Sequence, residues 1–379
     1  MEIRIEKAVE AVEQANEALH AQRIEAAKAR IGGFFERIKE TTYEPIPTGL
    51  KYIDDAIGGG MMRGQMVVLG AAPGIGKTAL ATWIFSKLAL KRIPSIYLNL
   101  EMSGDQLTAR RFSTAIAEDG HTLTPAEILQ GYKRNPEELE WIKAAADKIT
   151  AIDAYMTSPE RIDAALGAVT AHIEAEAVAA EKAGQRAPFV VLDYLQKVTG
   201  NPSEDKTVVI QRATAAMKEY ALKHKSIAFV IVAHNRESNK GGKITMEAAR
   251  DTSDIEYTAD LQMGISYTGC LKEYTRIGRD GKPYTYYRAP SDLNPIEQKF
   301  LTVKITKARF GESGVVEHLY FDGATMTFKQ IGIDWIPIDE SEGKTFEEFT
   351  GMKVDTKTGK ATERKKPTPS GQYKGVHHG

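Results

Sequence analysis

Short apolar runs recur through the middle of the chain and alternate with longer stretches whose apolar residues follow a helical spacing. Runs of this length, bounded by turn-forming residues, are typical of buried strands. The predicted strands are Met66–Leu69, Ser95–Leu100, Phe189–Leu192, Ile227–Val232, Leu261–Tyr267, Thr302–Thr306 and Val315–Phe321. Predicted helices such as Ala79–Leu90 and Arg161–Lys182 separate the early strands, which indicates an α/β domain around a mostly parallel sheet. The later strands have short links, which favours an antiparallel extension.

In residues 1–47, apolar residues recur at helical spacing among alanines and charged residues. This pattern predicts a helix that precedes the main domain. The recurring residues are Ile5, Val9, Val12 and Leu19. We expect the pair Gly32-Gly33 to interrupt this helix and Pro45 to end it. Its apolar stripe needs a partner, which is either the chain's own domain or a neighbouring subunit.

The main domain is expected at residues 48–335, followed by a polar and basic tail at residues 336–379. Within the domain, Tyr274–Phe300 is polar, aromatic and interrupted by prolines, which predicts a surface loop or hairpin. From about residue 352 the tail has few apolar residues and an excess of lysine and arginine, so we expect disorder there. A solvated tail and a tail that binds DNA or a partner protein both remain open.

Composition narrows the class of protein. Of the 379 residues, 42% are hydrophobic and 27% are charged, as in ordinary soluble globular proteins. The net charge of −1 gives no overall sign of nucleic-acid binding, so such binding would have to come from local basic patches. The one cysteine, Cys270, excludes an internal disulfide and a multi-cysteine zinc site. No apolar run reaches membrane-spanning length and the N-terminus does not read as a signal peptide, so we expect a cytoplasmic protein without a membrane partner.

The segment Ala71–Thr78 (AAPGIGKT) follows a predicted strand and opens a predicted helix. A strand, a glycine-rich loop ending in Gly-Lys-Thr, and a helix form a phosphate cradle in which backbone N–H groups face the β-phosphate. In such a loop Lys77 reaches the β- and γ-phosphate oxygens, and the Thr78 hydroxyl binds Mg²⁺. ATP with Mg²⁺ is therefore the expected cofactor. The expected nucleotide-binding residues are Ala72, Pro73, Gly74, Ile75, Gly76, Lys77, Thr78 and Ala79.

The same residues also fit a second motif. Gly74–Ala79 reads G-x-G-x-x-A, the fingerprint of dinucleotide-binding domains, and Glu101 lies roughly where a ribose-binding carboxylate would be. The dinucleotide turn is tight, however, whereas a longer loop separates Leu69 from Lys77 here. A Lys-Thr pair has no role in that turn but two roles in triphosphate binding, which favours a nucleoside triphosphate.

ATP hydrolysis also needs a second carboxylate for Mg²⁺ and a group that activates water. Two predicted strands lead into acidic residues, Asp193 after Phe189–Leu192 and Glu101 after Ser95–Leu100. The carboxyl ends of parallel strands share one edge of a sheet, so both acids should face the phosphate loop. We predict that Asp193 is a Walker B residue that holds the metal ion and that Glu101 polarises the attacking water. A carboxylate at a helix N-terminus is the alternative interpretation of Glu101.

Further polar residues lie at other strand ends. His234 follows the strand Ile227–Val232 at the same edge, where it is a candidate either for a hydrogen bond to the γ-phosphate or for a structural role. Lys307 and Arg309 lie two residues apart at a strand end, so their side chains should point to one side. They are candidates for pairs with surface carboxylates or for arginine-finger groups that enter a neighbour's ATP site, which would require an oligomer.

Together these segments resemble the DnaB-like replicative helicases, which belong to the RecA-like ATPases. The similarity extends from about Thr48 to about Phe321, most of the chain. Besides the phosphate loop, it rests on Thr48–Asp54, Gly58–Gly60, Leu100–Ser103 (LEMS), Leu192–Gln196 (LDYLQ), Ile255-Glu256, Ala259-Asp260 and Lys307–Gly311 (KARFG). The LEMS and DYLQ pieces are specific to this family, whereas the phosphate loop alone is not.

The resemblance implies a RecA-like P-loop fold and an ATP-hydrolysing DNA helicase. It implies that Lys77 and Thr78 bind phosphate and Mg²⁺, that Asp193 holds the metal ion, and that Glu101 activates water.

The resemblance also implies that Lys307 and Arg309 act across a ring interface. His234 stands where the bacterial enzymes have glutamine, but a histidine occupies the equivalent place in some phage relatives, so a γ-phosphate-sensing role is implied.

A candidate DNA-binding loop follows from the same resemblance. Arg250–Ser253 (RDTS) stands where the family has Arg-Glu-Ser-Gly, in a central loop that contacts the single-stranded DNA backbone. This implies DNA-binding roles for Arg250, Asp251 and Ser253, with Arg250 as the expected phosphate contact. Lys240 and Lys243 are further candidates in a nearby glycine-containing loop, for which a solvated basic loop is the alternative.

The bacterial enzymes carry a globular domain before a linker helix, whereas only residues 1–47 precede Thr48 here. The N-terminal segment therefore resembles the linker helix that docks on an adjacent subunit, and a phage or mobile-element helicase of reduced form fits this organisation.

The sequence predicts a ring-shaped homo-oligomer, expected to be a hexamer, that translocates on single-stranded DNA and unwinds forked duplex during replication. A primase or a helicase loader is a possible partner. Two alternatives remain open, a RecA/RadA-type recombination ATPase without processive unwinding and a non-unwinding ATP switch or loader.

Overall fold

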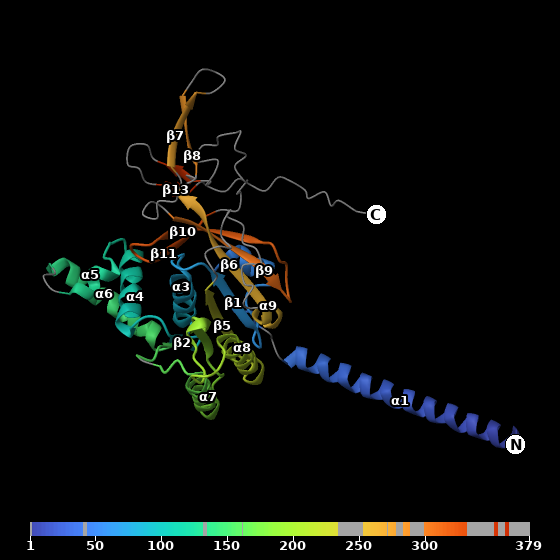
Figure 1. Ribbon diagram of the computed structural model, residues 1–379. Coiled ribbons are helices and arrows are strands. Elements are labelled where there is room, and N and C mark those ends of the chain that lie inside the picture. The colour runs from blue at the N-terminus through green and yellow to red at the C-terminus, as the bar shows by residue number, and fades with distance from the viewer. Residues whose placement is uncertain are drawn as a thin grey trace. The chain divides into compact units, whose positions relative to one another are not determined.

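The computed structural model describes residues 2–40, 44–131, 135–160, 162–233, 253–270, 272–277, 283–288, 299–331, 352–354 and 361–363. The chain divides into two units, Met1–Pro45 and Ile46–Gly379, and each is described by itself. Figure 1 shows the long helix of the first unit and the α/β body of the second.

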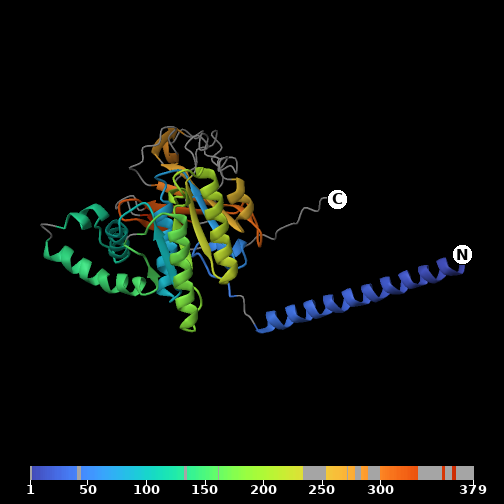
Figure 2. The ribbon, with the colours of Figure 1, turned by 60° about the horizontal axis from the view of Figure 1, so that its bottom comes forward.

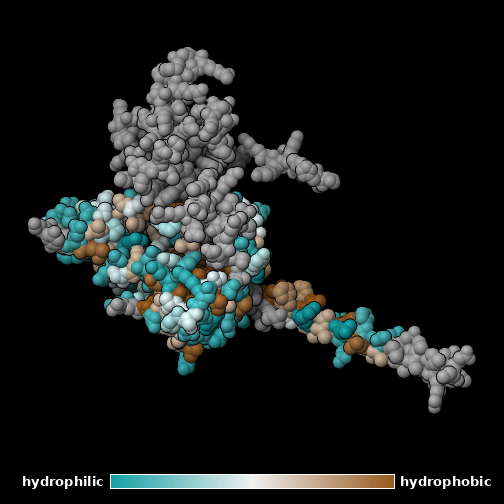
Figure 3. All heavy atoms as spheres, viewed as in Figure 1, coloured by the Kyte–Doolittle hydropathy of each residue, from teal (hydrophilic) through white to brown (hydrophobic). Residues whose placement is uncertain are grey.

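The first unit contains helix α1 (Glu2–Glu40), which has 39 residues. The helix predicted for this segment is confirmed, but the prediction that Gly32-Gly33 interrupts it is wrong, because α1 continues through both glycines. A helical glycine costs about 1 kcal/mol relative to alanine, and the many Ala, Glu, Lys and Arg residues of α1 offset that cost. Apolar residues gather on its C-terminal part, which is brown in Figure 3. The exposed apolar side chains there are Ile31, Phe34, Phe35 and Ile38.

The second unit is built on a nine-stranded sheet in the order β11-β10-β9-β6-β1-β5-β4-β2-β3. The six strands from β6 to β3 in this order are parallel, and β9, β10 and β11 extend the sheet with antiparallel pairing. The predicted parallel sheet and its antiparallel extension are thereby confirmed. The strands are β1 (Met66–Ala71), β2 (Ser95–Asn99), β3 (Met156–Thr157), β4 (Phe189–Asp193), β5 (Ala228–Ala233), β6 (Leu261–Cys270), β9 (Lys299–Ala308), β10 (Val316–Asp322) and β11 (Thr327–Ile331).

Side chains alternate along the strands between two apolar layers, one on each face of the sheet. Leu69 and Phe229 lie in the layer that also contains residues of α3, whereas Val68 and Val230 lie in the layer that contains residues of α7 and α8. Figure 2 shows α7 and α8, coloured green to yellow-green, side by side in front of the sheet. These helices are α3 (Lys77–Leu90), α7 (Leu166–Lys182) and α8 (Lys206–Lys223).

Three helices, α4 (Gly104–Glu118), α5 (Pro125–Gln130) and α6 (Pro136–Asp153), lie between β2 and β3 in the chain. Ser103 and Thr124 begin α4 and α5 with capping boxes, in which each hydroxyl accepts a hydrogen bond from a backbone N–H three residues later. These caps fix where both helices start, so the direction of α4 is set immediately after β2.

Short elements complete the second unit: α2 (Lys51–Ala56), the 3-10 helix η1 (Leu195–Lys197), α9 (Ser253–Thr258), β7 (Lys272–Ile277) and β8 (Pro283–Arg288). Strands β7 and β8 pair as an antiparallel hairpin, which confirms the hairpin expected in this region.

In the tail, β12 (Met352–Val354) and β13 (Ala361–Glu363) pair with each other, so these residues differ from the expectation of disorder. Among the described residues, no helix combines the length and the apolar character that crossing a membrane requires.

Candidate functional site

A glycine-rich loop joins the end of β1 to the start of α3. Gly74 and Gly76 adopt left-handed backbone conformations, with φ angles of 80° and 99°. A Cβ atom at Gly76 would lie 3.2 Å from Cε1 of Phe321, so both the φ angle and the space favour glycine there. Ala72 and Ile75 are buried and anchor the loop in the apolar layer.

The loop borders a cavity of about 400 Å³. Six of the eight residues predicted to bind nucleotide line it, namely Pro73, Gly74, Gly76, Lys77, Thr78 and Ala79. Glu101 lines the same cavity, so the structure brings together two segments that are far apart in the sequence. The cavity is large enough for a nucleotide-sized ligand.

Lys77, the first residue of α3, is only 9% exposed. Its ammonium donates hydrogen bonds to the carbonyl oxygens of Ala71 and Ala72, at 2.9 and 2.8 Å. Burial lowers the pKa of Lys77, while the charges of Asp193 and Glu101 act to raise it. Since its direct partners are neutral carbonyls, this cation is suited to bind an anionic ligand in the cavity.

Asp193 ends β4 and is 1% exposed. Its Oδ2 atom accepts a hydrogen bond from the Tyr97 hydroxyl at 2.9 Å, whereas Oδ1 is buried without a hydrogen-bond partner. Burial raises the pKa of Asp193, and the nearby side chains of Thr78 and Tyr97 oppose that effect.

An oxygen ligand of this kind fits Mg²⁺, which commonly takes one or two carboxylates and the phosphates of its nucleotide. The described residues contain no cluster of three or more His, Cys, Asp or Glu side chains that could hold an ion without the nucleotide.

Glu101 follows β2 and is held by the side chain of Asn99. The side-chain Oδ1 atom of Asn99 accepts hydrogen bonds from the backbone N–H groups of Glu101 and Met102, at 3.1 and 3.0 Å. Asn99 pairs with Asp193 across β2 and β4, so both acids lie at the same edge of the sheet. Ser103 caps α4 and accepts from the N–H of Gln106. Glu101 therefore lies two residues before the cap of α4, and both interpretations of its role stay predictions.

Several predicted residues lie outside the part of the chain that the structure describes. They are His234, Lys240, Lys243, Arg250 and Asp251. Ser253 is the first residue of α9, and its side chain is not described. Ala233, which precedes the first of these residues, lines the cavity. The Gln196 side chain holds Ala233 through two hydrogen bonds to its backbone, at 3.0 and 3.1 Å.

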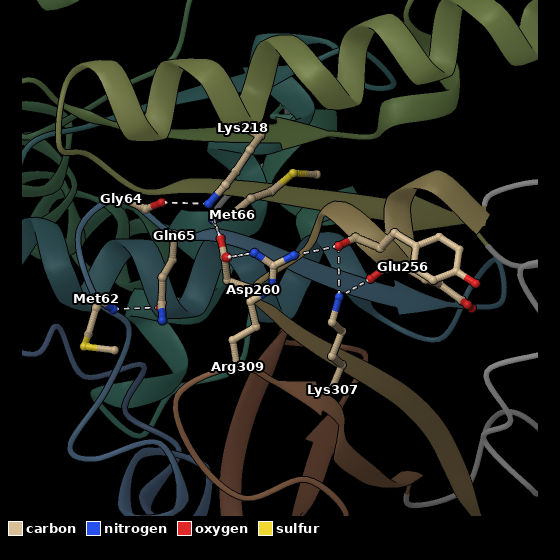
Figure 4. A network of polar contacts seen from close by, with 10 residues as sticks. Met62, Gly64, Gln65, Met66, Lys218, Glu256, Asp260, Lys307 and Arg309 are labelled. Carbon is tan, nitrogen blue, oxygen red and sulfur yellow. Dashed lines mark hydrogen bonds and ion pairs between the residues drawn. The ribbon is translucent and has the colours of Figure 1, made fainter. Parts of the chain in front are cut away.

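Lys307 and Arg309 lie next to each other, as Figure 4 shows, and neither lines the cavity. The Lys307 ammonium donates to the carbonyl oxygens of Glu256 and Tyr257 at the end of α9. Arg309 donates to the same Tyr257 oxygen at 2.8 Å and to the Asp260 carboxylate at 3.2 Å. Both cations are therefore anchored to α9 and to the residues just after it.

Asp260 ties this cluster to the start of β1. It is 3% exposed, and its Oδ2 atom accepts from the N–H of Met66 at 2.8 Å and from the Lys218 ammonium at 2.6 Å. β1 has six residues, Met66 being the first and Ala71 the last. At about 3.3 Å per residue, the cluster lies roughly 17 Å from the phosphate loop, at the opposite edge of the sheet.

Comparison with known protein families decides the identity of the domain. The model of the DnaB-like helicase C-terminal domain matches residues 45–330. The chain belongs to this family. The match covers the phosphate loop, both strand-end acids and the Lys307–Arg309 cluster, so the resemblance drawn from the motifs is confirmed.

Individual relatives of this DnaB-like domain are distant. A probable plasmid replicative DNA helicase of Chlamydia muridarum (strain MoPn / Nigg) is 26% identical over 231 residues, 60% of this chain and 48% of the relative. The chain spans about half the length of the curated relatives that it matches first.

Two solved structures share the fold of the DnaB-like domain. One, described as an ATPase domain, aligns with a TM-score of 0.62 at 17% identity, covering 80% of this chain and 98% of that chain. A DnaB-like replicative helicase, described with its interactions with primase, aligns with a TM-score of 0.60 at 17% identity, covering 79% and 65%. Both confirm the predicted RecA-like architecture.

The structure adds residues to the DnaB-like site that the sequence did not indicate. Arg110 of α4 lines the cavity, and so do Tyr194, Phe321 and Met326. Phe321 and Met326 come from the antiparallel part of the sheet and its turn, and nothing in their local spacing signals an approach to the phosphate loop. Arg110 lies nine residues after Glu101, outside the motifs that carry the family resemblance, so no motif assigned it a role.

Proposed function

We propose that this chain is an ATP-driven, ring-forming DNA helicase motor that translocates on single-stranded DNA and unwinds forked duplex during replication. The observation that carries the proposal is one cavity bordered by the phosphate loop, Lys77, Thr78 and Glu101, with the buried Asp193 at the same sheet edge. Membership of the DnaB-like family supports DNA as the polymer along which the protein translocates.

In this proposal Lys77 binds the β- and γ-phosphate oxygens of ATP, in place of its present carbonyl partners. Thr78 and Asp193 hold Mg²⁺, which when bound neutralises charge on the phosphate oxygens. Glu101 orients and polarises the attacking water from the mouth of the cavity. The exposed position of Glu101 suits this role, because the attacking water must reach the γ-phosphate from solvent.

Lys307 and Arg309 complete the site of a neighbouring copy in the proposed ring. Their position, roughly 17 Å from the chain's own phosphate loop along β1, supports action between subunits. A head-to-tail arrangement of identical copies would bring this cluster to the next cavity and close into a ring, for which we propose a hexamer. Helix α1 would dock on the adjacent copy through its exposed apolar residues.

The remaining roles are extensions of the same proposal. His234 would sense the γ-phosphate, and the segment from Lys240 to Ser253 would contact the DNA backbone, with Arg250 as the main phosphate contact. Binding through the backbone predicts little sequence specificity. A primase or loader is a proposed partner, and the cytoplasm, where bacterial and phage DNA is replicated, is the proposed location.

Two alternative functions can be distinguished from the helicase by whether DNA stimulates ATP hydrolysis and whether the protein unwinds a forked duplex. A RecA/RadA-type recombination ATPase would be stimulated by single-stranded DNA but would not unwind a forked duplex. An ATP switch or loader would bind ATP without DNA stimulation. The family match over residues 45–330 favours the helicase over both.

The first test is the ATPase rate with and without single-stranded DNA. We expect strong stimulation of the wild type, abolished in Glu101→Gln and retained in Glu137→Gln, which changes an exposed carboxylate of α6. Unwinding of a forked duplex should follow the same order. A wild-type rate that is indifferent to DNA would contradict the motor.

Subunit mixing tests the action between copies. Glu101→Gln chains supply intact Arg309, and Arg309→Ala chains supply intact Glu101. In a random equal mixture, about a quarter of the interfaces therefore combine an intact Glu101 with an intact Arg309. We expect the mixture to hydrolyse ATP faster than either variant alone. A mixture no faster than the mean of the two variants would refute the proposed role of Arg309.

A further inference from the structure

Tyr97 is a polar side chain placed where only apolar packing would be expected. It lies in the middle of β2, is 0% exposed, and is among the largest fully buried side chains of the chain. Its ring packs in the same apolar layer as residues of α3. A phenylalanine would fill this space without having to satisfy a buried hydroxyl, so the hydroxyl needs its own explanation.

The hydroxyl of Tyr97 reaches the acid at the end of the neighbouring strand. Tyr97 pairs with Val191 across β2 and β4, and Asp193 lies two residues further on the same face. A diagonal neighbour of this kind is within reach only of a long side chain. The phenol is long enough, and it donates to Oδ2 of Asp193 at 2.9 Å.

The same hydroxyl lies close to the helix that carries the other proposed magnesium ligand. Thr82, one turn after Thr78 on α3, has its hydroxyl 3.5 Å from the Tyr97 oxygen. The Thr78 carbonyl oxygen is also 3.5 Å from it. The shorter contact to Asp193 takes the phenol proton, and Thr82 donates toward the phenol oxygen. Tyr97 therefore bridges β4 and α3 beneath the phosphate loop.

This contact distinguishes the two oxygens of the Asp193 carboxylate. Oδ2 accepts from the phenol and Oδ1 is buried with no hydrogen-bond partner, while the Thr78 side chain also acts on the carboxylate. Rotation about the terminal torsion of aspartate is broad and roughly two-fold, so the carboxylate needs an external group to fix its plane. The Tyr97 hydroxyl is such a group.

We propose that Tyr97 is a positioning residue, which orients Asp193 so that Oδ1 is presented to the Mg²⁺ of the bound nucleotide. This role rests on the proposed function, because it requires that the cavity bind a magnesium nucleotide. Tyr97 itself touches neither nucleotide nor metal. Partners of this kind, hydrogen-bonded to a ligand rather than to the ion, set metal affinity by about 10-fold to 100-fold.

The test measures how much Mg²⁺ the full-length chain needs to bind a fluorescent ATP analogue. Tyr97→Phe keeps the ring and removes the donor. We expect its half-saturating Mg²⁺ concentration to rise about 10-fold or more, with affinity for the analogue in EDTA unchanged. A residue that only stabilised the fold would not change the Mg²⁺ requirement while sparing metal-free binding.

Tyr220→Phe is the matched control. Tyr220 of α8 is 1% exposed, packs in the other apolar layer and donates its hydroxyl proton to the Pro188 carbonyl at 2.7 Å. It loses the same atom from an equally buried site away from the cavity, so its Mg²⁺ requirement should match the wild type.

A third variant keeps the test informative if Tyr97→Phe does not fold. p-Aminophenylalanine at position 97 retains a donor on the ring, so we expect a Mg²⁺ requirement close to that of the wild type, and a rise of about 10-fold or more would overturn the role of the hydrogen bond. A folded Tyr97→Phe protein with the wild-type requirement would overturn the role of Tyr97 and leave the proposed function intact. A wild type whose nucleotide binding ignores Mg²⁺ would overturn both.

Discussion

Glu317 on β10 offers a quantitative test of how burial governs this fold. Its side chain is 0% exposed, and its Oε2 atom accepts a hydrogen bond from the N–H of Tyr52 at 2.7 Å, in the first turn of α2. Oε1 is buried without a hydrogen-bond partner. Burial raises the pKa of Glu317 to about 7, against the opposing effect of the Tyr52 and Ile53 N–H groups. The substitution Glu317→Gln removes the titration and preserves the shape.

The sign follows from which state binds the proton more tightly. The ordinary pKa of this carboxyl is 4.5 and the folded-state pKa is about 7, so the folded state binds the proton more tightly. The stability that protonated Glu317 contributes is fully present below its pKa in the unfolded state, and it is lost as the pH rises through its pKa in the folded state. At ~1.4 kcal/mol per pKa unit, the loss approaches about 3 kcal/mol. The neighbouring His318, whose pKa is lowered by burial, titrates with the opposite sign.

The assay is urea unfolding of the full chain at a series of pH values from about 5 to about 8, for the wild type and Glu317→Gln. Subtracting the two curves removes the contribution of His318 and of the other titrating groups. We expect the wild type to lose up to about 3 kcal/mol relative to the variant across this range. Glu312→Gln, an exposed carboxylate before β10, is the control and should show no such trend. A difference that is independent of pH would refute the burial argument.

Two further changes test the candidate site. Gly76→Ala combines a φ angle of 99° with a Cβ contact of 3.2 Å to Phe321, so we expect about a tenfold or greater loss of ATP-analogue affinity. Gly167→Ala, which meets nothing within 4 Å, should retain wild-type affinity, and equal losses in both would contradict the explanation. Asn99→Ala removes the acceptor that holds the turn before α4, so we expect kcat to fall about tenfold with KM for ATP within about twofold. A change confined to KM would show that Asn99 does not position Glu101.

Much of the fold could be predicted because its signals are local. The buried strand that ends at Asp193 is a continuous apolar run, and the phosphate loop is marked by glycines and the Lys-Thr pair within eight residues. The topology rule that parallel strands end at one edge then placed Glu101 and Asp193 together, as the pairing of β2 and β4 confirms.

The contacts that the sequence did not indicate connect distant segments. The approach of Phe321 to Gly76 depends on how the antiparallel strands fold over the loop, and no residue spacing encodes that distance. Tyr97 lies within an apolar run, so nothing in the sequence indicated a polar contact of its hydroxyl, and the partner of that hydroxyl lies 96 residues away. Along α1 the error was energetic, because a glycine pair breaks a helix only when its neighbours have weak helix propensity. The segment holding His234 and Arg250 lies outside the described residues, so those roles stay predictions.

The phosphate loop and the Lys307–Arg309 cluster lie at opposite ends of β1, so the protomer has two different faces, a front and a back. Two copies facing each other with two-fold symmetry would bring front to front or back to back and complete neither site. If Lys307 and Arg309 act on a neighbouring copy, as proposed, only a repeating front-to-back contact lets each copy complete the next cavity, and an open row leaves one cavity and one cation pair unmatched. In the proposed arrangement, closing the row into a ring brings the unmatched cation pair to the unmatched cavity. Every ATP site is then complete, so catalysis itself would favour a closed ring over an open row of copies.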